Sequence, residues 1–191
     1  ADVPGLPDEL HTTVVDVQPT PHLVLRTAAY RGFRAPTLNE QLRPFRVRND
    51  LTEANAALDA EKLVGVEAGL DFEQGPWRSS LTGFWNRVDD PIFNVTVGTG
   101  EGMVDPCGYV PAGGVCRQRR NLGSTSIPGL EVSTSLDLGR GLSVAASYLW
   151  SEGRVRSAPG APALEGNRLP QVPRHQGTLG LDWDEGGPWR A

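Results

Sequence analysis

The stretch LEVSTSLDLGRGLSVAASYLW, residues 130–150, decides the fold. On each side of its central turn, Gly139-Arg140-Gly141, every second residue except Thr134 is apolar, and most of the others are polar or small. Alternation at period two predicts β-strands with one apolar face. A short glycine-rich turn between two such strands predicts an antiparallel hairpin. The same alternation recurs at residues 63–72 and 178–183.

Long and short connections separate the predicted strands in turn. Short turns are expected at residues 74–76, 139–141 and 185–188, and long loops at about 34–60, 89–120 and 156–173. Tight turns at one end and long loops at the other are typical of bacterial outer-membrane barrels. We therefore predict an all-β, antiparallel meander of about seven strands. The expected strands are 12–18, 22–33, 61–73, 76–88, 120–137, 142–155 and 174–184, followed by the start of an eighth.

In a barrel the apolar face contacts lipid and the polar face lines the lumen. We expect a lipid-facing set of Val64, Val66, Leu70, Leu130, Val132, Leu136, Val144 and Leu181. The carboxylates expected to point inward are Glu67, Asp71, Glu131, Asp137 and Asp182. Aromatic residues flank the short turns, as in an interfacial girdle: Phe72, Trp77, Trp183 and Trp189. Trp85 lies roughly 19 Å from Trp77 along the membrane normal, comparable with the apolar band. The alternative is that these are core aromatics of a soluble β-protein.

Composition excludes several other classes of protein. The chain has 191 residues, 38% hydrophobic content and a net charge of −5, without an apolar run long enough for a transmembrane helix. The acidic balance argues against nucleic acid as a partner, and no enzyme motif or metal-spaced Cys/His set is present. We expect no catalytic residue, no metal site and no cofactor. The first residues show no signal peptide, which suggests that the chain was cut from a longer one.

Four segments resemble TonB-dependent outer-membrane receptors. FRAPTLNE at 33–40 is similar to a strand-to-loop segment of that family, and NAALDAE at 55–61 resembles its NPxLxPE motif with Ala56 and Ala60 in place of the prolines. NRVDDPI at 86–92 and GNRLPQVPRH at 166–175 resemble two further strand-end motifs. The motif positions are Phe33, Arg34, Ala35, Pro36, Asn55, Leu58, Asn167, Pro170, Pro173 and His175.

The resemblance implies a barrel of 22 strands that is closed by an N-terminal plug and takes up scarce nutrients with energy relayed by TonB. Residues 1–191 would then be an incomplete piece of the barrel domain, with plug and closing strands absent, in the bacterial outer membrane. Its expected partners are outer-membrane lipid, lipopolysaccharide and a small-molecule nutrient, with TonB reached only through the plug. The alternative is a smaller porin-like or adhesive β-protein that binds a surface partner through its long loops.

The expected ligand contacts are arginines of the first long loop. Residues 31–50 hold an excess of three positive charges in an acidic chain, and the candidates are Arg34, Arg43, Arg46 and Arg48. A basic funnel would attract an anionic substrate, such as a ferric siderophore or a phosphate-bearing corrinoid. These arginines could instead pair with loop carboxylates or with lipopolysaccharide phosphates. Haem is disfavoured because residues 37–54 lack the histidine that haem receptors of the family carry there.

Cys107 and Cys116 lie nine residues apart in the second long loop, which we expect to be flexible. An oxidising compartment favours a disulfide between them. A two-ligand metal site is the alternative, although no histidine or third cysteine stands nearby.

Overall fold

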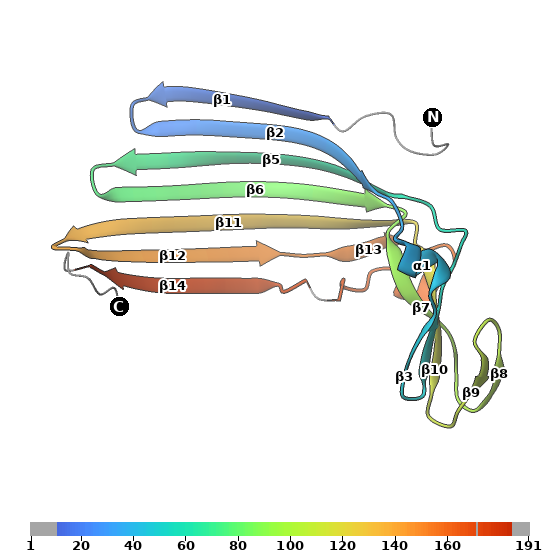
Figure 1. The fold of residues 1–191 in the computed structure, drawn as a ribbon. Helices are drawn as coiled ribbons and strands as arrows, with labels where there is room; N and C mark the ends of the chain where they lie inside the picture. The colour runs from blue at the N-terminus through green and yellow to red at the C-terminus, as the bar shows by residue number, and fades with distance from the viewer. Residues whose placement is uncertain (1–10, 171, 185–191) are drawn as a thin grey trace.

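One large antiparallel sheet dominates the computed structural model, which describes residues 11–170 and 172–184. Its strands follow the order β1-β2-β5-β6-β11-β12-β14 (Figure 1). The bounds are β1 Thr12–Thr20, β2 Leu23–Arg34, β5 Glu61–Gln74, β6 Trp77–Asp89, β11 Ser124–Gly139, β12 Leu142–Ser151 and β14 His175–Trp183. The short turns gather at one end of the sheet and the long connections at the other (Figure 1). The predicted seven-strand meander is therefore confirmed.

Two strand boundaries differ from the predictions by four residues, and the others by at most two. Residues 120 and 121 belong to a separate strand of another sheet, so β11 begins at Ser124. The predicted strand 142–155 ends at Ser151, and β13 (Arg154–Ser157) follows as a separate strand paired with the outer part of β11. The predicted turn at 185–188, Trp189 and the start of an eighth strand lie outside the described residues.

The long connections contain regular structure rather than open loops. They form α1 (Leu38–Leu42), the 3-10 turn Pro162–Leu164, and the strands β3 Phe45–Val47, β4 Asp50–Glu53, β7 Ile92–Thr99, β8 Gly102–Val104, β9 Gly108–Val110 and β10 Val115–Asn121. A second sheet has the order β3-β4-β10-β7, in which β10 runs parallel to β4. Among the described residues, no helix is long and apolar enough to cross a membrane.

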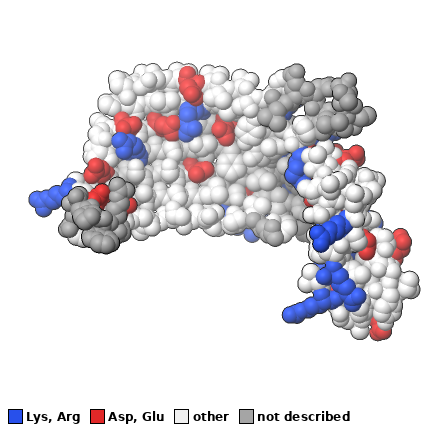
Figure 2. Space-filling view, viewed as in Figure 1, with Lys and Arg blue, Asp and Glu red and all other residues white. Residues whose placement is uncertain are grey.

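Cross-strand register divides the side chains of the large sheet into two faces, because directly paired residues point to the same side. Leu25, Leu70, Leu81, Val132 and Tyr148 form one continuous row of such pairs. The predicted lipid-facing residues all share this apolar face, and the five predicted inward carboxylates share the opposite face. Charged side chains lie in the middle of the sheet on the face shown in Figure 2, which is the polar face.

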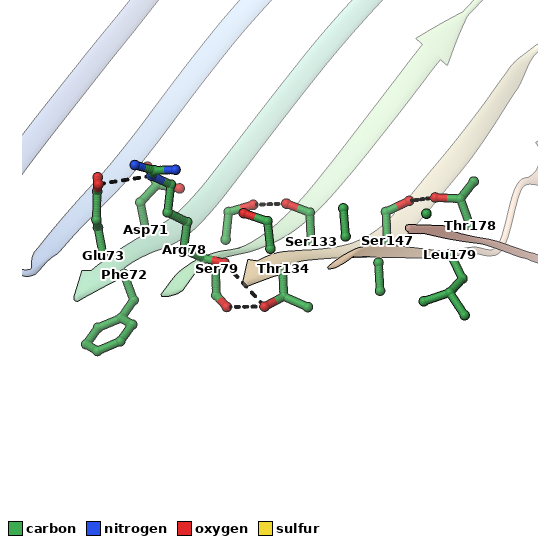
Figure 3. Close-up of a pocket in the computed structure, with 15 residues that line it drawn as sticks. Asp71, Phe72, Glu73, Arg78, Ser79, Ser133, Thr134, Ser147, Thr178 and Leu179 are labelled. Atoms are coloured by element: carbon green, nitrogen blue, oxygen red, sulfur yellow. Dashed lines mark hydrogen bonds and ion pairs between the residues drawn. The ribbon is translucent and has the colours of Figure 1, made fainter. Parts of the chain in front are cut away.

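The alternation is visible near the short turns. Asp71, Arg78 and Ser133 project to one side of the sheet, whereas Phe72 and Leu179 project to the other (Figure 3). Because the surrounding side chains belong to both faces, this region is not a single binding cavity. On the apolar face, polar side-chain groups form hydrogen bonds within the sheet. Trp77 Nε1 donates to Thr134 Oγ1 at 2.9 Å, and the hydroxyls of Ser79 and Thr134 lie 2.7 Å apart. Polar groups in hydrocarbon need such partners within the protein, because no water is available to them.

Two glycines make room for aromatic rings on the polar face. A Cβ atom at Gly65 would lie 2.2 Å from Tyr30 Cε2, and one at Gly129 would lie 2.2 Å from Phe84 Cζ. Each ring therefore lies across a neighbouring strand at the point where a side chain is missing. The Tyr30 hydroxyl also donates to Asn86 Oδ1 at 2.8 Å, which fixes its ring in this position.

The two faces should respond differently to an added charge. We expect Leu81→Arg, in the middle of the apolar face, to destabilise the barrel in lipid by about 2–4 kcal/mol. Thr82→Arg, one residue further along β6, should have little effect because its side chain points to the polar face beside Glu131. Urea unfolding of both variants in lipid vesicles measures the difference. Equal destabilisation by the two variants would contradict the assigned faces.

Candidate functional site: the external loop module

The external loop module comprises the long connections at residues 35–60, 90–123 and 152–174. It lies at the end of the large sheet opposite the short turns (Figure 1). A small apolar core holds its parts together: Val95, Leu122, Val155 and Ala158 are buried, and Phe93 and Leu164 pack against them. Val95 and Leu122 come from the second long connection, and Val155 and Ala158 come from the third. The core therefore joins these two connections into a folded unit on which polar side chains can be positioned.

Arg34 holds α1 against the outer ends of β2 and β5. Its Nε lies 2.5 Å from Glu61 Oε2, and its Nη1 donates to Glu40 Oε2 at 2.9 Å. Glu40 also closes a capping box with Thr37 at the start of α1. The other oxygen of Glu61 accepts from the Ile92 amide at 2.7 Å. Arg34 is thus engaged by two carboxylates, and its geometry fits a positioning role.

The same contacts set the protonation behaviour of Glu40. Partial burial by itself would raise its pKa, but hydrogen bonds from Arg34 and Thr37 outweigh burial and lower the pKa from 4.5 to about 2. A carboxyl group whose pKa is lowered by folding stabilises the folded form at pH values above its unfolded pKa.

The stability of α1 should therefore depend on pH. We expect the Glu40 contacts to be fully present above pH 4.5 and to be lost as the pH falls toward about 2. Their contribution to local stability is about 1–2 kcal/mol, allowing for solvent screening. Glu40→Gln should speed amide hydrogen exchange in residues 38–42 at pH 6, with Glu53→Gln as the matched control. Unchanged exchange in Glu40→Gln would refute the assignment.

The next family-motif residues tie the first long connection to β10. Asn55 donates through its side-chain Nδ2 to the Arg119 carbonyl and through its backbone N–H to the Glu40 carbonyl, each at 3.0 Å. Leu58 is only 7% exposed. Arg119 donates to the carbonyls of Asn39 and Arg43, and its guanidinium lies 5.3 Å from the centre of the Phe45 ring. The sequence does not reveal the role of Arg119, because its only signal there is a basic run that does not show these partners.

The third long connection is held by its own motif residues. Asn167 Nδ2 donates to the Ala163 carbonyl at 3.1 Å, and the Pro173 carbonyl accepts from Ser151 Oγ at 3.0 Å. His175 begins β14, with Nδ1 within 2.6 Å of the Tyr148 hydroxyl. The remaining motif positions, Phe33, Ala35, Pro36 and Pro170, flank these segments without a side-chain hydrogen bond. A cluster not expected from the sequence joins Glu152 to three arginines, Arg154, Arg168 and Arg174, within 3.3 Å.

Arg43, Arg46 and Arg48 are placed differently from Arg34. All three are exposed, and no ion pair among the described residues involves them. Arg46 Nε donates to the Arg48 carbonyl at 2.6 Å, which keeps the two residues together at the β3–β4 turn. Basic side chains are prominent on the module in Figure 2. In contrast, Arg117 of β10 is paired with Asp50 at 3.0 Å. Three guanidinium groups therefore remain available to solvent or to a ligand.

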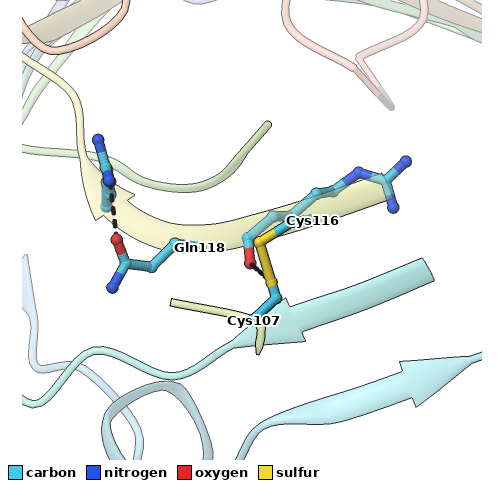
Figure 4. The surroundings of a disulfide bond; sticks show 5 residues. Cys107, Cys116 and Gln118 are labelled. Atoms are coloured by element: carbon cyan, nitrogen blue, oxygen red, sulfur yellow. Dashed lines mark hydrogen bonds between the residues drawn. A yellow bond between two sulfur atoms is a disulfide. The ribbon is translucent and has the colours of Figure 1, made fainter. Parts of the chain in front are cut away.

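Cys107 and Cys116 are joined by a disulfide (Figure 4). Cys116 lies in β10 and is fully buried, whereas Cys107 immediately precedes β9. The expectation of a flexible loop is wrong at Cys116, which pairs with Leu51 of β4 in the second sheet. Beyond it on β10, Gln118 accepts from Arg120 Nε at 2.9 Å (Figure 4). The disulfide thus attaches the β8–β9 hairpin to the second sheet.

Removing the disulfide should affect only the loop module. We expect Cys107→Ser with Cys116→Ser to leave the strand content measured by circular dichroism unchanged. Cys116 belongs to the second sheet, and β10 does not pair with any strand of the large sheet. The same variant should increase proteolysis between residues 100 and 115. Loss of the large sheet in the double variant would contradict this local role.

A cleft of about 610 Å³ lies between β7 and the Gly160–Leu164 segment. Its only charged lining residues are Asp105 and Arg120, which come from the second long connection. The described residues contain no group of three or more His, Cys, Asp or Glu side chains that could hold a metal ion. The module therefore offers polar and cationic contacts to a ligand.

An antiparallel meander with a lipid-compatible face, short turns at one end and a folded loop module at the other defines the wall of an outer-membrane β-barrel. The family described as "TonB dependent receptor-like, beta-barrel" matches residues 13–191, and the chain belongs to this family. Members of this family are outer-membrane transport proteins and not enzymes. No curated protein matches the sequence.

Solved structures share the fold at low sequence identity. The copper transporter OprC is 21% identical, with a TM-score of 0.66 over 92% of this chain and 24% of that one. The siderophore receptor PirA from Pseudomonas aeruginosa is 18% identical, with a TM-score of 0.66 over 90% and 30% of the two chains. A ferric enterobactin receptor mutant (PfeA) from the same species, in complex with enterobactin, is 19% identical, with a TM-score of 0.65 over 93% and 26%. This chain thus spans less than a third of each.

Proposed function

We propose that this chain forms part of the wall and outer vestibule of a TonB-dependent transporter that takes up an anionic metal chelate or corrinoid. Family membership supports the transporter class and disfavours a small porin-like or adhesive protein. The similar structures include a siderophore receptor and an enterobactin complex, which supports the choice of a small chelate as substrate.

The proposed substrate class rests on a difference in ion pairing among the loop arginines. Arg34 and Arg117 are neutralised by carboxylates, whereas Arg43, Arg46 and Arg48 are exposed and have no ion pair among the described residues. Unpaired guanidinium groups at the mouth of a barrel attract anions from solution and bind carboxylate, phosphate or catecholate oxygens in a fork geometry. Cationic cargo would be repelled at the same place.

The proposed transporter contains further barrel strands and a plug domain. β1 and β14 each pair with one neighbour within the described residues, so each has an unpaired side. Unpaired strand edges do not persist in hydrocarbon. We infer that further barrel strands pair with both edges and that a plug, which contacts TonB, fills the lumen that the polar face would line.

Charge at the three exposed arginines should control capture of the ligand. In the full-length receptor, replacing Arg43, Arg46 and Arg48 by Gln should slow association of a ferric tris-catecholate by roughly tenfold at low salt, with a smaller effect at high ionic strength. Stopped-flow fluorescence quenching measures the rate. A triple replacement by Lys keeps the charge and should retain most of the rate.

Two results would contradict the proposal in different ways. If the Gln and Lys variants associate equally fast, charge at these positions does not guide the ligand. If neither a ferric tris-catecholate nor cobalamin binds the unmodified receptor at micromolar concentration, the proposed substrate class is wrong.

A further inference from the structure

Charged residues on the apolar face are confined to its outer end. Within the described parts of the seven main strands, the Asp, Glu, Lys and Arg residues on this face are Arg31, Lys62, Arg87 and Asp89. The pairings of Arg31 with Val64 and of Val64 with Arg87 place the two arginines in one row. Lys62 pairs with Asp89 in the next row outward. Three cations and one anion thus form a band just outside the apolar surface.

A cleft in this band has the chemistry of an anion site. It has a volume of about 380 Å³ and is lined by Trp85, Arg87, Ser124, Thr125, Ser126 and Arg156. No carboxylate is among these lining residues. Arg156 is exposed and donates from Nε to Ser126 Oγ at 2.6 Å, which holds its guanidinium beside the Ser126 hydroxyl. Arg87 is paired with one carboxylate, that of Asp89: its Nη2 lies 2.8 Å from Oδ1, and its Nε donates to Oδ1 and Oδ2 at 2.9 and 3.2 Å. The band still has three cations for one anion. Two guanidinium groups and the hydroxyls of Ser124 and Ser126 therefore line one open space on the outward side.

The cleft lies at the level at which lipid headgroups surround the barrel. Arg87 lies two residues beyond Trp85, or about 7 Å along the strand. Trp85 and Trp150 stand on the outward face, where tryptophan marks the boundary between hydrocarbon and headgroups. The residues below, such as Val66 and Leu130, are apolar and exposed. A molecule that fits both regions has a phosphate at the level of the arginines and acyl chains that run down the apolar face.

We propose that Arg87 and Arg156 bind a phosphate of a phosphorylated glycolipid in the outer leaflet. The guanidinium groups bind the phosphate oxygens, Ser124 and Ser126 supply hydroxyl donors, and Trp85 packs against the sugar or the first part of an acyl chain. Free phosphate would use the same two arginines but would gain nothing from the tryptophan or the apolar face. The acyl chains therefore distinguish the lipid from the free anion.

The test uses the full-length receptor in detergent with purified diphosphorylated lipid A as the probe and native mass spectrometry as the readout. Arg87→Gln with Arg156→Gln should weaken lipid A binding by roughly tenfold or more, the effect of losing a charge-assisted hydrogen bond. Lipid A without phosphates should bind the unmodified receptor as weakly as the variant binds the intact lipid. Inorganic phosphate at millimolar concentration should not displace the lipid.

The matched control carries Arg78→Gln and Arg140→Gln, which remove the same charge at the opposite end of the barrel and should leave binding unchanged. Heat-modifiable migration in gels verifies that both double variants are folded. If the Arg87→Gln, Arg156→Gln double variant does not fold, the two single variants are measured in its place. Equal binding by the unmodified receptor and the folded variant would overturn the proposal. So would equal binding of phosphorylated and phosphate-free lipid, or displacement by inorganic phosphate, which would indicate a free-anion site.

Discussion

Backbone hydrogen bonding between neighbouring strands is the constraint on which the rest of this structure depends. In hydrocarbon no water is available to the amide and carbonyl groups, so each strand must pair along its length. The antiparallel ladder from β1 to β14 meets this demand within the sheet and fixes its register. Register in turn decides which side chains face lipid, because a shift by one residue would exchange the two faces. Leu70 and Asp71 are neighbours in sequence and lie in entirely different surroundings.

Arginine has several roles in this chain, and its neighbours decide which one applies. Arg34, Arg117 and Arg154 are paired with carboxylates and hold loops in place. Arg43 and Arg46 are left exposed at the mouth. Charge therefore serves first to build the loop module and only then to present a surface to solutes. An overall acidic sequence can still carry a locally basic loop surface, since most of the described carboxylates belong to the polar face or to ion pairs.

The sequence reveals the large sheet well because alternation at period two is a local signal that each strand carries by itself. The second sheet has no such signal: β3 has three residues, and the parallel pairing of Cys116 with Leu51 joins segments from different loops. β11 was expected to begin at residue 120 because nothing in its sequence marks where the chain leaves one sheet for another. The role of Arg34 was equally hidden, since a motif shows that an arginine is present but not that Glu40 and Glu61 surround it.

The glycines beneath Tyr30 and Phe84 shape the surface of the polar face. A ring that rests in the space above Gly65 or Gly129 lies flat along the wall instead of standing out from it. The aromatic side chains thereby add little to the thickness of the sheet. Rigid ring faces rather than flexible side chains therefore cover this part of the polar face.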